Sequence, residues 1–215
     1  MAGPDFETPR VAGVILAAGR SARFGADLPK QLHRIGGQTL VHYSACVALG
    51  SQLRRIVVVT GHRGADVGAV VAGLAVEVVH NPNFADGQST SVKAGLAAVA
   101  SDADAVLFIP CDLPNLDVPA IDRLIEAYAE SRGPIVVPVA EGKRRAPVLI
   151  DRSLFGEIDG VTGDRGARQI FPAHEDEIVE VVFDSALPFE DLDRPSASPR
   201  GGSDRQANPV GDGSG

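Results

Sequence analysis

The residues best suited to chemistry form a loop in which a glycine precedes several cations. From Arg20 to Arg34, directly after Gly19, the chain carries one acid, Asp27, and four basic side chains, namely Arg20, Arg23, Lys30 and Arg34. Exposed backbone amides beside small residues, together with cations, are what a phosphate group requires. No Lys follows Gly25 as in a Walker A loop, and the GxGxxG spacing of a dinucleotide site is absent. We interpret the stretch as an anion-binding loop, with a solvated basic turn as the alternative.

Carboxylates that could bind a metal ion come from two separate places. Asp112 follows an apolar run, and both Asp191 and Asp193 lie near the end of the chain. Mg²⁺ binds one or two carboxylates together with water and substrate phosphates. We therefore expect a Mg²⁺ cofactor on Asp112 and on either Asp191 or Asp193, a choice that the sequence leaves open. The alternative for Asp112 is a helix cap that follows a strand.

Two further polar segments could contact a ligand. Gly87-Gln-Ser-Thr-Ser91 stands where a helix is expected to begin, so its amides and hydroxyls either cap that helix or hydrogen-bond a ligand. Lys143-Arg-Arg145 is suited either to an anionic substrate or to a solvated surface. The histidines have no metal-ligand spacing, and no nucleophile with a paired base is evident. Direct displacement is therefore favoured over covalent catalysis.

These side chains need a scaffold that brings their loops to one edge. Continuous apolar runs are typical of strands that are buried on both faces, and they occur at 11–18, 55–60, 75–80, 105–110 and 134–139. Helical patterns separate them at 38–49, 65–73, 90–100 and 118–131. This alternation predicts right-handed βαβ units and a three-layer, doubly wound α/β domain with a mostly parallel sheet. Ligands of such sheets bind at the carboxyl ends of the strands, where Gly19 and Asp112 are both expected.

The pattern changes after residue 138. We expect a strand over 145–150, a short helix over 153–158, a helix capped by the Thr162 side chain, and strands over 178–183 and 189–192. The last strand would place Asp191 and Asp193 on the same face. The expected organisation is an N-terminal extension over 1–10, one domain over 11–194, and a disordered tail rich in Ser, Pro and Gly over 195–215.

The composition restricts the class of partner. The 215 residues include 20 basic and 28 acidic side chains, for a formal net charge of −8, and no Trp. A nucleic-acid surface needs a basic face and stacking aromatics, so no nucleic-acid partner is expected. No signal peptide and no membrane-spanning run is evident, which favours a cytoplasmic protein without a membrane partner. Cys46 and Cys111 have no partner motif and are expected to be free thiols.

Several segments together resemble a known family. Leu16-Ala-Ala-Gly-Arg-Ser-Ala-Arg-Phe-Gly25 followed by Lys30 is similar to the signature of MobA-like nucleotidyltransferases. The segments 81–96 and 147–155, with Thr162-Gly-Asp-Arg-Gly-Ala-Arg168, resemble molybdenum cofactor cytidylyltransferases. The similarity covers about residues 11–193. It implies a nucleotide-diphospho-sugar transferase-like fold and the transfer of CMP from CTP to the phosphate of molybdopterin cofactor, with release of pyrophosphate.

The resemblance also implies roles for single residues. Arg23 and Lys30 would neutralise charge on the attacked α-phosphate, and Asp112 would hold the metal. The residues that it places around the nucleotide are Leu16, Ala17, Ala18, Gly19, Gly87, Gln88 and Ser91. The residues on the side of the second substrate would be Arg145, Asp164 and Arg165. The partners are then CTP, a phosphorylated small-molecule acceptor, and a molybdoenzyme that receives the finished cofactor.

Three departures from the pattern leave alternatives open. The loop that ends in Pro29-Lys30-Gln31 is similar to that of methylerythritol-phosphate cytidylyltransferase, which has the same chemistry. Cys111 stands where the family usually has Gly, and the acidic helix that usually follows the last aspartate is missing after Asp193. These two departures favour, as an alternative, a weakly catalytic protein that binds nucleotide or cofactor for delivery. The choice between CTP and GTP also stays open.

Overall fold

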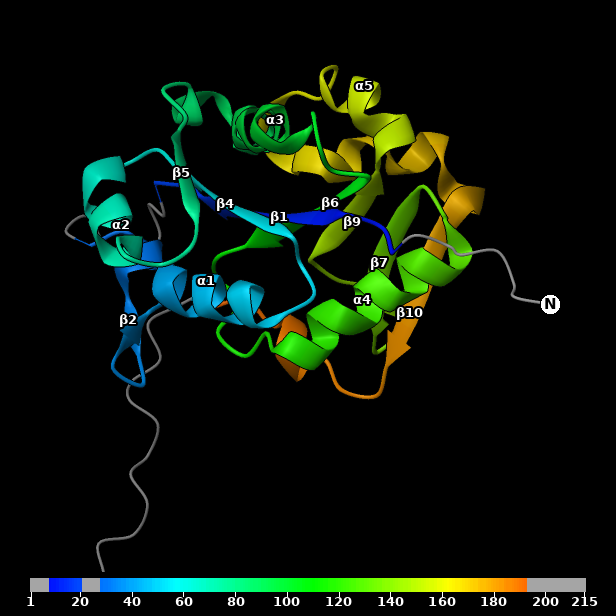
Figure 1. Ribbon diagram of the computed structural model, residues 1–215, viewed down its shortest axis with the longest axis horizontal. Helices are drawn as coiled ribbons and strands as arrows, with labels where there is room; N and C mark the ends of the chain where they lie inside the picture. Colours follow the sequence, from blue (N-terminus) through cyan, green and yellow to red (C-terminus); the bar gives the residue numbers. More distant parts are fainter. Residues whose placement is uncertain (1–7, 21–27, 193–215) are drawn as a thin grey trace, which may run out of the picture.

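The apolar runs of the sequence form the strands of one large sheet (Figure 1). The computed structural model describes residues 8–20 and 28–192. The strands of the sheet are β1 (Val11–Ala17), β4 (Arg55–Thr60), β5 (Glu77–His80), β6 (Ala105–Pro110), β7 (Ile135–Ala140), β8 (Lys143–Arg144), β9 (Val148–Asp151) and β10 (Ile178–Phe183). The central strands β1 and β6 are almost wholly buried, which is why their sequences are apolar without alternation.

The sheet is mostly parallel, as the sequence predicts. The strand order is β10-β7-β9-β6-β1-β4-β5, with β8 paired to β7. Along that path only β9 is reversed, because it pairs antiparallel with both β6 and β7. The strands β1, β4 and β6 therefore end at the same edge, and the loops that follow them lie together there.

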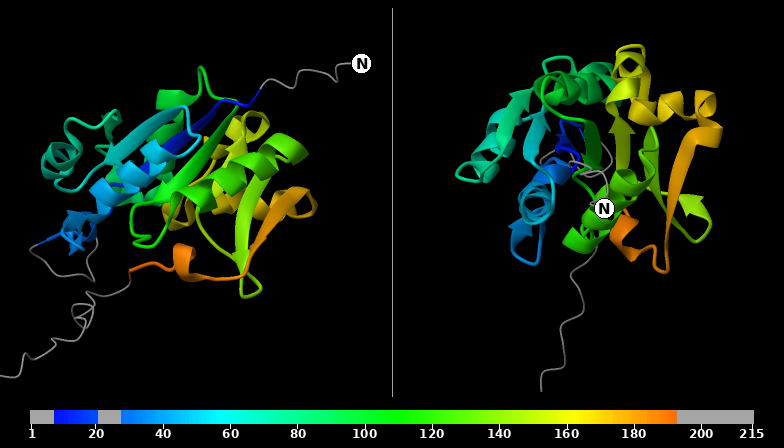
Figure 2. Two further views of the ribbon diagram at one scale, coloured as in Figure 1. Left: turned by 60° about the horizontal axis from the view of Figure 1, so that its bottom comes forward. Right: turned by 45° about the vertical axis from the view of Figure 1, so that its right-hand side comes forward.

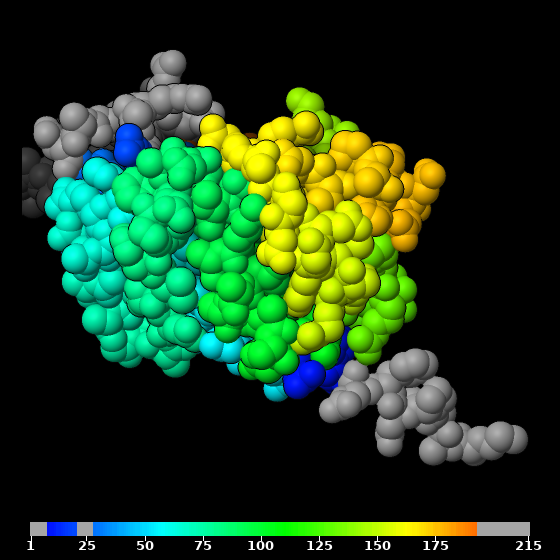
Figure 3. Space-filling model, turned by 90° about the horizontal axis from the view of Figure 1, so that it is seen from above, coloured from blue at the N-terminus to red at the C-terminus, as the bar shows by residue number. Residues whose placement is uncertain are grey.

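Helices cover both faces of this sheet and give the predicted three layers. Val11 and Ile15 of β1 pack toward one face, where α1 (Leu40–Gly50), α2 (Gly64–Val71) and α4 (Val118–Ser131) lie. Ala12 and Val14 pack toward the other face, which carries α3 (Gln88–Val99), α5 (Phe155–Ile158) and the 3-10 segment η4 (Gly163–Ala173). Figure 3 looks onto this second face, where α3, in green, lies beside the yellow residues around α5.

Short elements connect the layers. The 3-10 turns are η1 (Lys30–Leu32), η2 (Phe84–Asp86), η3 (Arg152–Leu154), η5 (Glu175–Glu177) and η6 (Leu187–Phe189). A small hairpin of β2 (Arg34–Ile35) and β3 (Gln38–Thr39), which the sequence analysis did not predict, precedes α1. Its turn, Gly36-Gly37, has positive φ angles of 59° and 90°, which glycine adopts readily. The predicted helix over 38–49 therefore begins only at Leu40, after Thr39 caps it.

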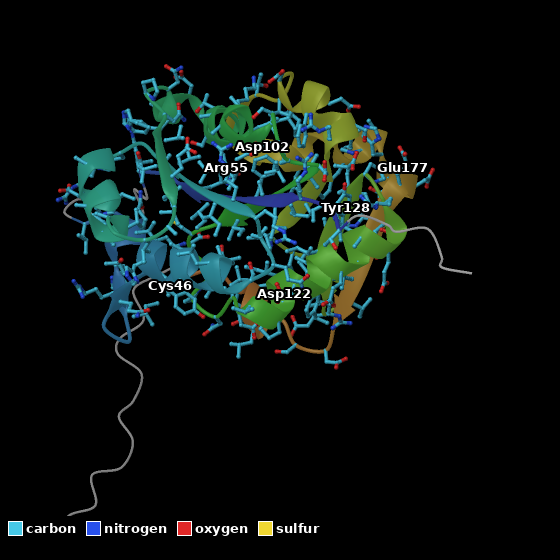
Figure 4. The ribbon with its side chains drawn as sticks, viewed as in Figure 1. Cys46, Arg55, Asp102, Asp122, Tyr128 and Glu177 are labelled. Carbon is cyan, nitrogen blue, oxygen red and sulfur yellow. The ribbon has the colours of Figure 1, made fainter. Side chains whose placement is uncertain are left out.

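Polar side chains tie the opposite, amino edge of the sheet together. Arg55 Nη2 lies 2.6 Å from Glu77 Oε2, and its Nη1 lies 3.1 Å from Asp102 Oδ1. Figure 4 shows Arg55, at the start of β4, next to Asp102, in the turn between α3 and β6. The Tyr128 hydroxyl of α4 donates to Asp151 Oδ2 of β9 at 2.5 Å. These contacts hold the scaffold at the edge that carries none of the predicted site residues among those that the structure describes.

Two predictions about the C-terminal half are wrong. Residues 189–192 form no strand; η6 ends at Phe189, and the chain then crosses the carboxyl edge, where Leu192 N–H donates to Asp112 O. The chain meets a loop there and not a neighbouring strand, so no ladder forms. Thr162 makes no side-chain cap, since η4 is a 3-10 segment kinked at Gly166, and Gln169 hydrogen-bonds both backbone groups of Thr162 in its place.

The remaining elements match closely. The strands over 55–60, 105–110 and 178–183 and the helix over 118–131 have the predicted bounds. Cys46 and Cys111 are free thiols, as expected. Among the described residues no helix is long and apolar enough to cross a membrane. The expected domain bounds stay predictions, and the tail 195–215, most of the extension 1–10 and Arg23 lie outside the described residues.

Candidate active site at the carboxyl edge of the sheet

A buried glutamine hydrogen-bonds the backbone of the loop after β1. Gln31 Nε2 donates to Ala17 O at 3.0 Å and to Gly19 O at 2.8 Å. This amide group is buried, so its two hydrogen bonds fix where the backbone turns away from the sheet. Ala18 is buried and Gly19 is exposed, which leaves the backbone at this turn accessible to a ligand.

Lys30 and Asp112 form an ion pair across the edge of the sheet. Lys30 Nζ lies 2.9 Å from Asp112 Oδ2, and the two side chains are only 14% and 29% exposed. Lys30 comes from the loop after β1, whereas Asp112 follows β6, so the pair joins residues that are 82 positions apart. The partial burial makes this pair stronger than a fully solvated one. The sequence predicted both residues as catalytic, and the fold brings them into direct contact.

The N-terminus of α3 forms a second wall. Gly87, with φ 111°, caps the helix and lies so close to Gly163 that a Cβ at Gly87 would stand 2.6 Å from that backbone. Asn81 Nδ2 donates to Thr90 Oγ1 at 2.8 Å and to Ser91 Oγ at 3.0 Å. The Ser91 side chain does not cap the helix. The hydrogen bond from Asn81 fixes the position of its hydroxyl group.

A first cavity of about 350 Å³ lies between the loop after β1 and the N-terminus of α3. Nine residues to which the resemblance assigns a role line it, namely Leu16, Ala18, Gly19, Lys30, Gly87, Gln88, Ser91, Asp112 and Asp164. Ala17 does not line it, because its side chain points into the core on the α1 side and its carbonyl accepts from Gln31. The cavity also meets Arg20, whose guanidinium carbon lies 5.4 Å from the centre of the Phe84 ring.

A second cavity of about 610 Å³ adjoins the first. Gln88, Pro110, Asp112 and Asp164 line both cavities. The predicted second-substrate residues Arg145, Asp164 and Arg165 line it together with two further arginines, Arg144 and Arg168. A ligand in either cavity can therefore reach the carboxylate of Asp112, and the second cavity is rich in cations that suit an anionic ligand.

Asp191 lines the second cavity as well. The hydrogen bond from Leu192 N to Asp112 O at 2.9 Å holds this segment beside the loop after β6. Figure 2 shows the segment, in orange, returning from β10 toward that edge. The structure thus brings Asp112 and Asp191 to one cavity, whereas Asp193 lies outside the described residues.

The donor set fits a metal ion only in part. Among residues 8–20 and 28–192 no group of three or more His, Cys, Asp or Glu side chains could hold a metal. Asp112 and Asp191 alone match the one or two carboxylates that Mg²⁺ takes when substrate phosphates supply further oxygens. The site suits an ion that arrives with a phosphate ligand, and it is not a closed protein cage.

Burial shifts two pKa values at the site. Desolvation raises the pKa of the buried Cys111 thiol, which stays protonated at neutral pH and is a poor nucleophile. Desolvation also lowers the pKa of Arg168, although an arginine remains charged at any physiological pH. Cys111 therefore acts as a small apolar residue beneath Asp112, and Arg168 keeps a charge in a partly dry environment.

Three residues that shape the cavities were not predicted from the sequence. Gln31 braces the first loop, and its position in Pro29-Lys30-Gln31 was the one available signal. Phe84 lines the first cavity, and a Cβ at Gly61 would stand 2.6 Å from it, so the ring is packed closely on the end of β4. Phe189 lines the second cavity from the 3-10 turn η6, at the start of the segment 189–192 that was predicted as a strand.

Comparisons with known proteins match one family model and several curated relatives. The family model described as "MobA-like NTP transferase domain" matches residues 13–178. Nicotine blue oxidoreductase of Paenarthrobacter nicotinovorans is 32% identical over 192 residues, which cover 83% of this chain and 89% of that protein. The bifunctional protein GlmU of Acidovorax ebreus is 34% identical over 127 residues, 55% of this chain, and the chain spans only 26% of that protein.

Solved structures share the fold. The Rv0371c homolog from Mycobacterium sp. strain JC1 has a TM-score of 0.75 and 26% identity, and the match covers 86% of this chain and 91% of that one. Rv0371c from Mycobacterium tuberculosis H37Rv, in complex with manganese, has a TM-score of 0.72 and 24% identity over 85% of this chain and 94% of that one. The second likeness, below 25% identity, shows the fold alone.

Proposed function

The chain belongs to the MobA-like NTP transferase family, and we propose that within this family it transfers CMP from CTP to the phosphate of molybdopterin cofactor. The coarser activity, nucleotidyl transfer, follows from the family. The observation that carries the proposal is the junction of two cavities at Asp112, one suited to a nucleotide and one to an anionic acceptor. A transferase requires such a junction, because both substrates must meet in line at one phosphorus atom.

CTP would occupy the first cavity. The backbone at Ala18 and Gly19 allows close approach of the triphosphate, and Lys30 would contact the α-phosphate from its place beside Asp112. Gln88 and Ser91, at the start of α3, would hydrogen-bond the edge of the base. Asn81 would keep the Ser91 hydroxyl in the required position.

The acceptor phosphate would lie where the two cavities join. One of its oxygens attacks the α-phosphorus of CTP, and the new P–O bond forms as the bond to the β-phosphate breaks. Pyrophosphate leaves with the electron pair of the broken bond. The attacking oxygen is already anionic at neutral pH, so no general base is needed. Lys30, together with Arg23 from the same loop, would stabilise the charge that builds up on the α-phosphate.

Asp112 and Asp191 would hold a Mg²⁺ ion, with Asp193 as the alternative to Asp191. When bound, the ion would neutralise phosphate oxygens of both substrates at the junction. The manganese complex of Rv0371c supports a divalent cation in a protein of the same fold. A molybdoenzyme that receives the product would be the protein partner.

Three observations each support an alternative function. Cys111 lines the first cavity directly beside Asp112, which supports a weakly catalytic carrier of nucleotide or cofactor. The resemblance of the first loop supports methylerythritol phosphate as the acceptor. The relative matched over 89% of its length is named an oxidoreductase, which favours a redox activity on the same fold.

A panel of pyrophosphate-release assays tests the proposal. CTP, GTP, UTP and ATP are each combined with molybdopterin, methylerythritol phosphate and a sugar phosphate in the presence of Mg²⁺. We expect release with CTP and molybdopterin to exceed every other pair by about a hundredfold, which a few well-placed hydrogen bonds can provide. Faster release with methylerythritol phosphate would show that this compound, and not molybdopterin, is the acceptor. Faster release with GTP would show that GTP, and not CTP, is the nucleotide. CTP binding without any release would favour the carrier, and nicotine blue reduction would favour the oxidoreductase.

A further inference from the structure

We infer that the second cavity binds a second anionic group of the acceptor, distinct from the phosphate that reacts, and that Arg168 is its principal ligand. This inference rests on the proposed function, since it describes the acceptor of that reaction. It assigns the acceptor to compounds that carry a reactive phosphate and, at some distance from it, a further oxyanion such as a carboxylate, a phosphate or an oxometalate.

The four arginines of the second cavity differ in how their charge is balanced. Arg144 is held by two carboxylates, at 2.8 Å from Glu175 and 2.6 Å from Glu180. Arg145 lies 3.1 Å from Glu141. Within the described part of the chain, Arg168 and its neighbour Arg165 form no ion pair. The two arginines of the cavity that form no ion pair therefore both lie on η4, which also brings the carboxylate of Asp164 to the cavity.

Burial distinguishes the arginines of this cavity from one another. Arg165 is exposed and its charge is well solvated, whereas Arg168 is only partly exposed and its pKa is lowered by desolvation. Arg145 Nε is fully buried and has no hydrogen-bond partner among the residues described. A guanidinium that loses water without gaining a carboxylate destabilises the folded protein, unless a ligand supplies the missing acceptor. Two arginines of one cavity thus carry unmet hydrogen-bonding capacity.

The position of Arg168 separates its ligand from the reacting phosphate. Asp112 lines both cavities, so the reacting phosphate belongs at their junction. Arg168 and Arg145 line only the second cavity. The second cavity, at about 610 Å³, is far larger than a phosphate group. An acceptor that places one phosphate at Asp112 must therefore extend into this space, where the guanidinium groups would bind an oxyanion through paired hydrogen bonds.

A matched pair of small phosphates tests the inference without the natural acceptor. Glycerol 3-phosphate and 3-phosphoglycerate differ in that a hydroxymethyl group of the first is a carboxylate in the second. Their affinities are measured by isothermal titration calorimetry for the full chain, for Arg168→Met and for Arg54→Met. Arg54 is an exposed arginine at the amino edge of the sheet, so its variant controls for the loss of one positive charge.

We expect the full chain and Arg54→Met to bind 3-phosphoglycerate at least about tenfold more tightly than glycerol 3-phosphate, as one charge-assisted hydrogen-bonded pair allows. Arg168→Met should bind the two compounds equally while its thermal unfolding midpoint stays unchanged or rises. Equal affinities in the full chain, or undiminished discrimination in Arg168→Met, would overturn the inference. Efficient pyrophosphate release with an acceptor that has a single anionic group would also overturn the inference. Nucleotidyl transfer itself, the proposed function, would then still stand. Discrimination without any pyrophosphate release would remove only the proposed function.

Discussion

The ion pair between Lys30 and Asp112 places opposite charges where the proposed reaction needs both. Asp112 cannot hold a divalent cation well while an ammonium group lies 2.9 Å from its carboxylate, because the two cations would repel each other. A triphosphate in the first cavity offers Lys30 another anionic partner. Nucleotide binding would thereby free Asp112 for the metal, so we expect the two ligands to strengthen each other's binding.

Replacing Lys30 tests this exchange. Lys30→Met should bind Mn²⁺ about tenfold more tightly than the unmodified protein when no nucleotide is present, because the competing charge is gone. The same variant should lose about a hundredfold or more in turnover, since the α-phosphate loses its cation. Electron paramagnetic resonance of free Mn²⁺ measures the first effect. Lys143→Met, at an exposed lysine, is the control, and an unchanged or weaker Mn²⁺ affinity in Lys30→Met would contradict the exchange.

The residue types of the first cavity were accessible from the sequence, whereas their supports were not. Lys30 and Asp112 stand in local patterns that indicate phosphate chemistry, and Gln88 stands where a helix start that could hydrogen-bond a ligand is predicted. Gln31 and Phe84 act through tertiary contacts, with the carbonyls of the β1 loop and with the end of β4. A buried amide and an aromatic ring are also common in cores that bind nothing, so their types alone predict no role.

At the scale of elements, the contact between Gly87 and Gly163 joins the start of α3 to η4. Gly87→Ala should destabilise the protein by about 1–3 kcal/mol, because the φ of 111° strains any residue with a Cβ and that atom would meet the Gly163 backbone at 2.6 Å. CTP affinity should fall with it, since the wall of the first cavity moves. Gly68→Ala is the control, because the added Cβ has only an ordinary contact at 3.8 Å. Urea unfolding measures the stability of both variants and of the unmodified protein. A Gly87→Ala variant as stable as the unmodified protein would show that the close contact between Gly87 and Gly163 is not required.

A histidine links two elements of the second half in a pH-dependent way. His174 Nε2 lies 2.9 Å from Glu157 Oε2 of α5, and its Nδ1 lies 2.8 Å from Glu177 Oε1 of η5, the residue labelled in Figure 4. These hydrogen bonds, first to Glu177 and then to Glu157, raise the pKa of His174. The raised pKa means that the link stabilises the fold fully below the unfolded-state pKa of about 6.5, and that this stability is lost as the pH rises through the folded-state value.

His174→Gln tests that link. Its thermal unfolding midpoint should lie about 2 °C below that of the unmodified protein at pH 6, and the two should converge by pH 9, where the imidazole is neutral in both states. A gap that persists unchanged at pH 9 would show that packing, and not charge, is responsible. Calorimetric scans across this pH range supply the comparison.

Element bounds were predictable where the pattern is local. The buried strands β4 and β6 and the capped helix α4 carry their own signals in apolar runs and an Asp117 cap. The reversed direction of β9 and the path of residues 189–192 depend on which element lies alongside, and a local pattern does not specify that. Because of that path, Asp191 reaches the second cavity from a loop and not from the predicted strand.

At the scale of the whole molecule, a net charge of −8 coexists with a cationic site. The basic side chains of the second cavity come from β8, its following loop and η4, and the fold gathers them beside Asp112. Net charge therefore carries no information about the charges at the site, and the expectation that no nucleic acid is a partner stays a prediction. The doubly wound topology explains the gathering, since it turns the ends of its parallel strands toward one edge.

Transfer of the α-phosphorus of CTP tests the central claim most directly. The protein is incubated with CTP labelled at the α-phosphorus, molybdopterin cofactor and Mg²⁺, and the label is followed by chromatography. We predict that the label appears on the cofactor in a one-to-one ratio with unlabelled pyrophosphate, and that Asp112→Asn reduces this transfer by about a hundredfold or more. Label that stays in bound CTP, or that appears only in free CMP, would contradict the account.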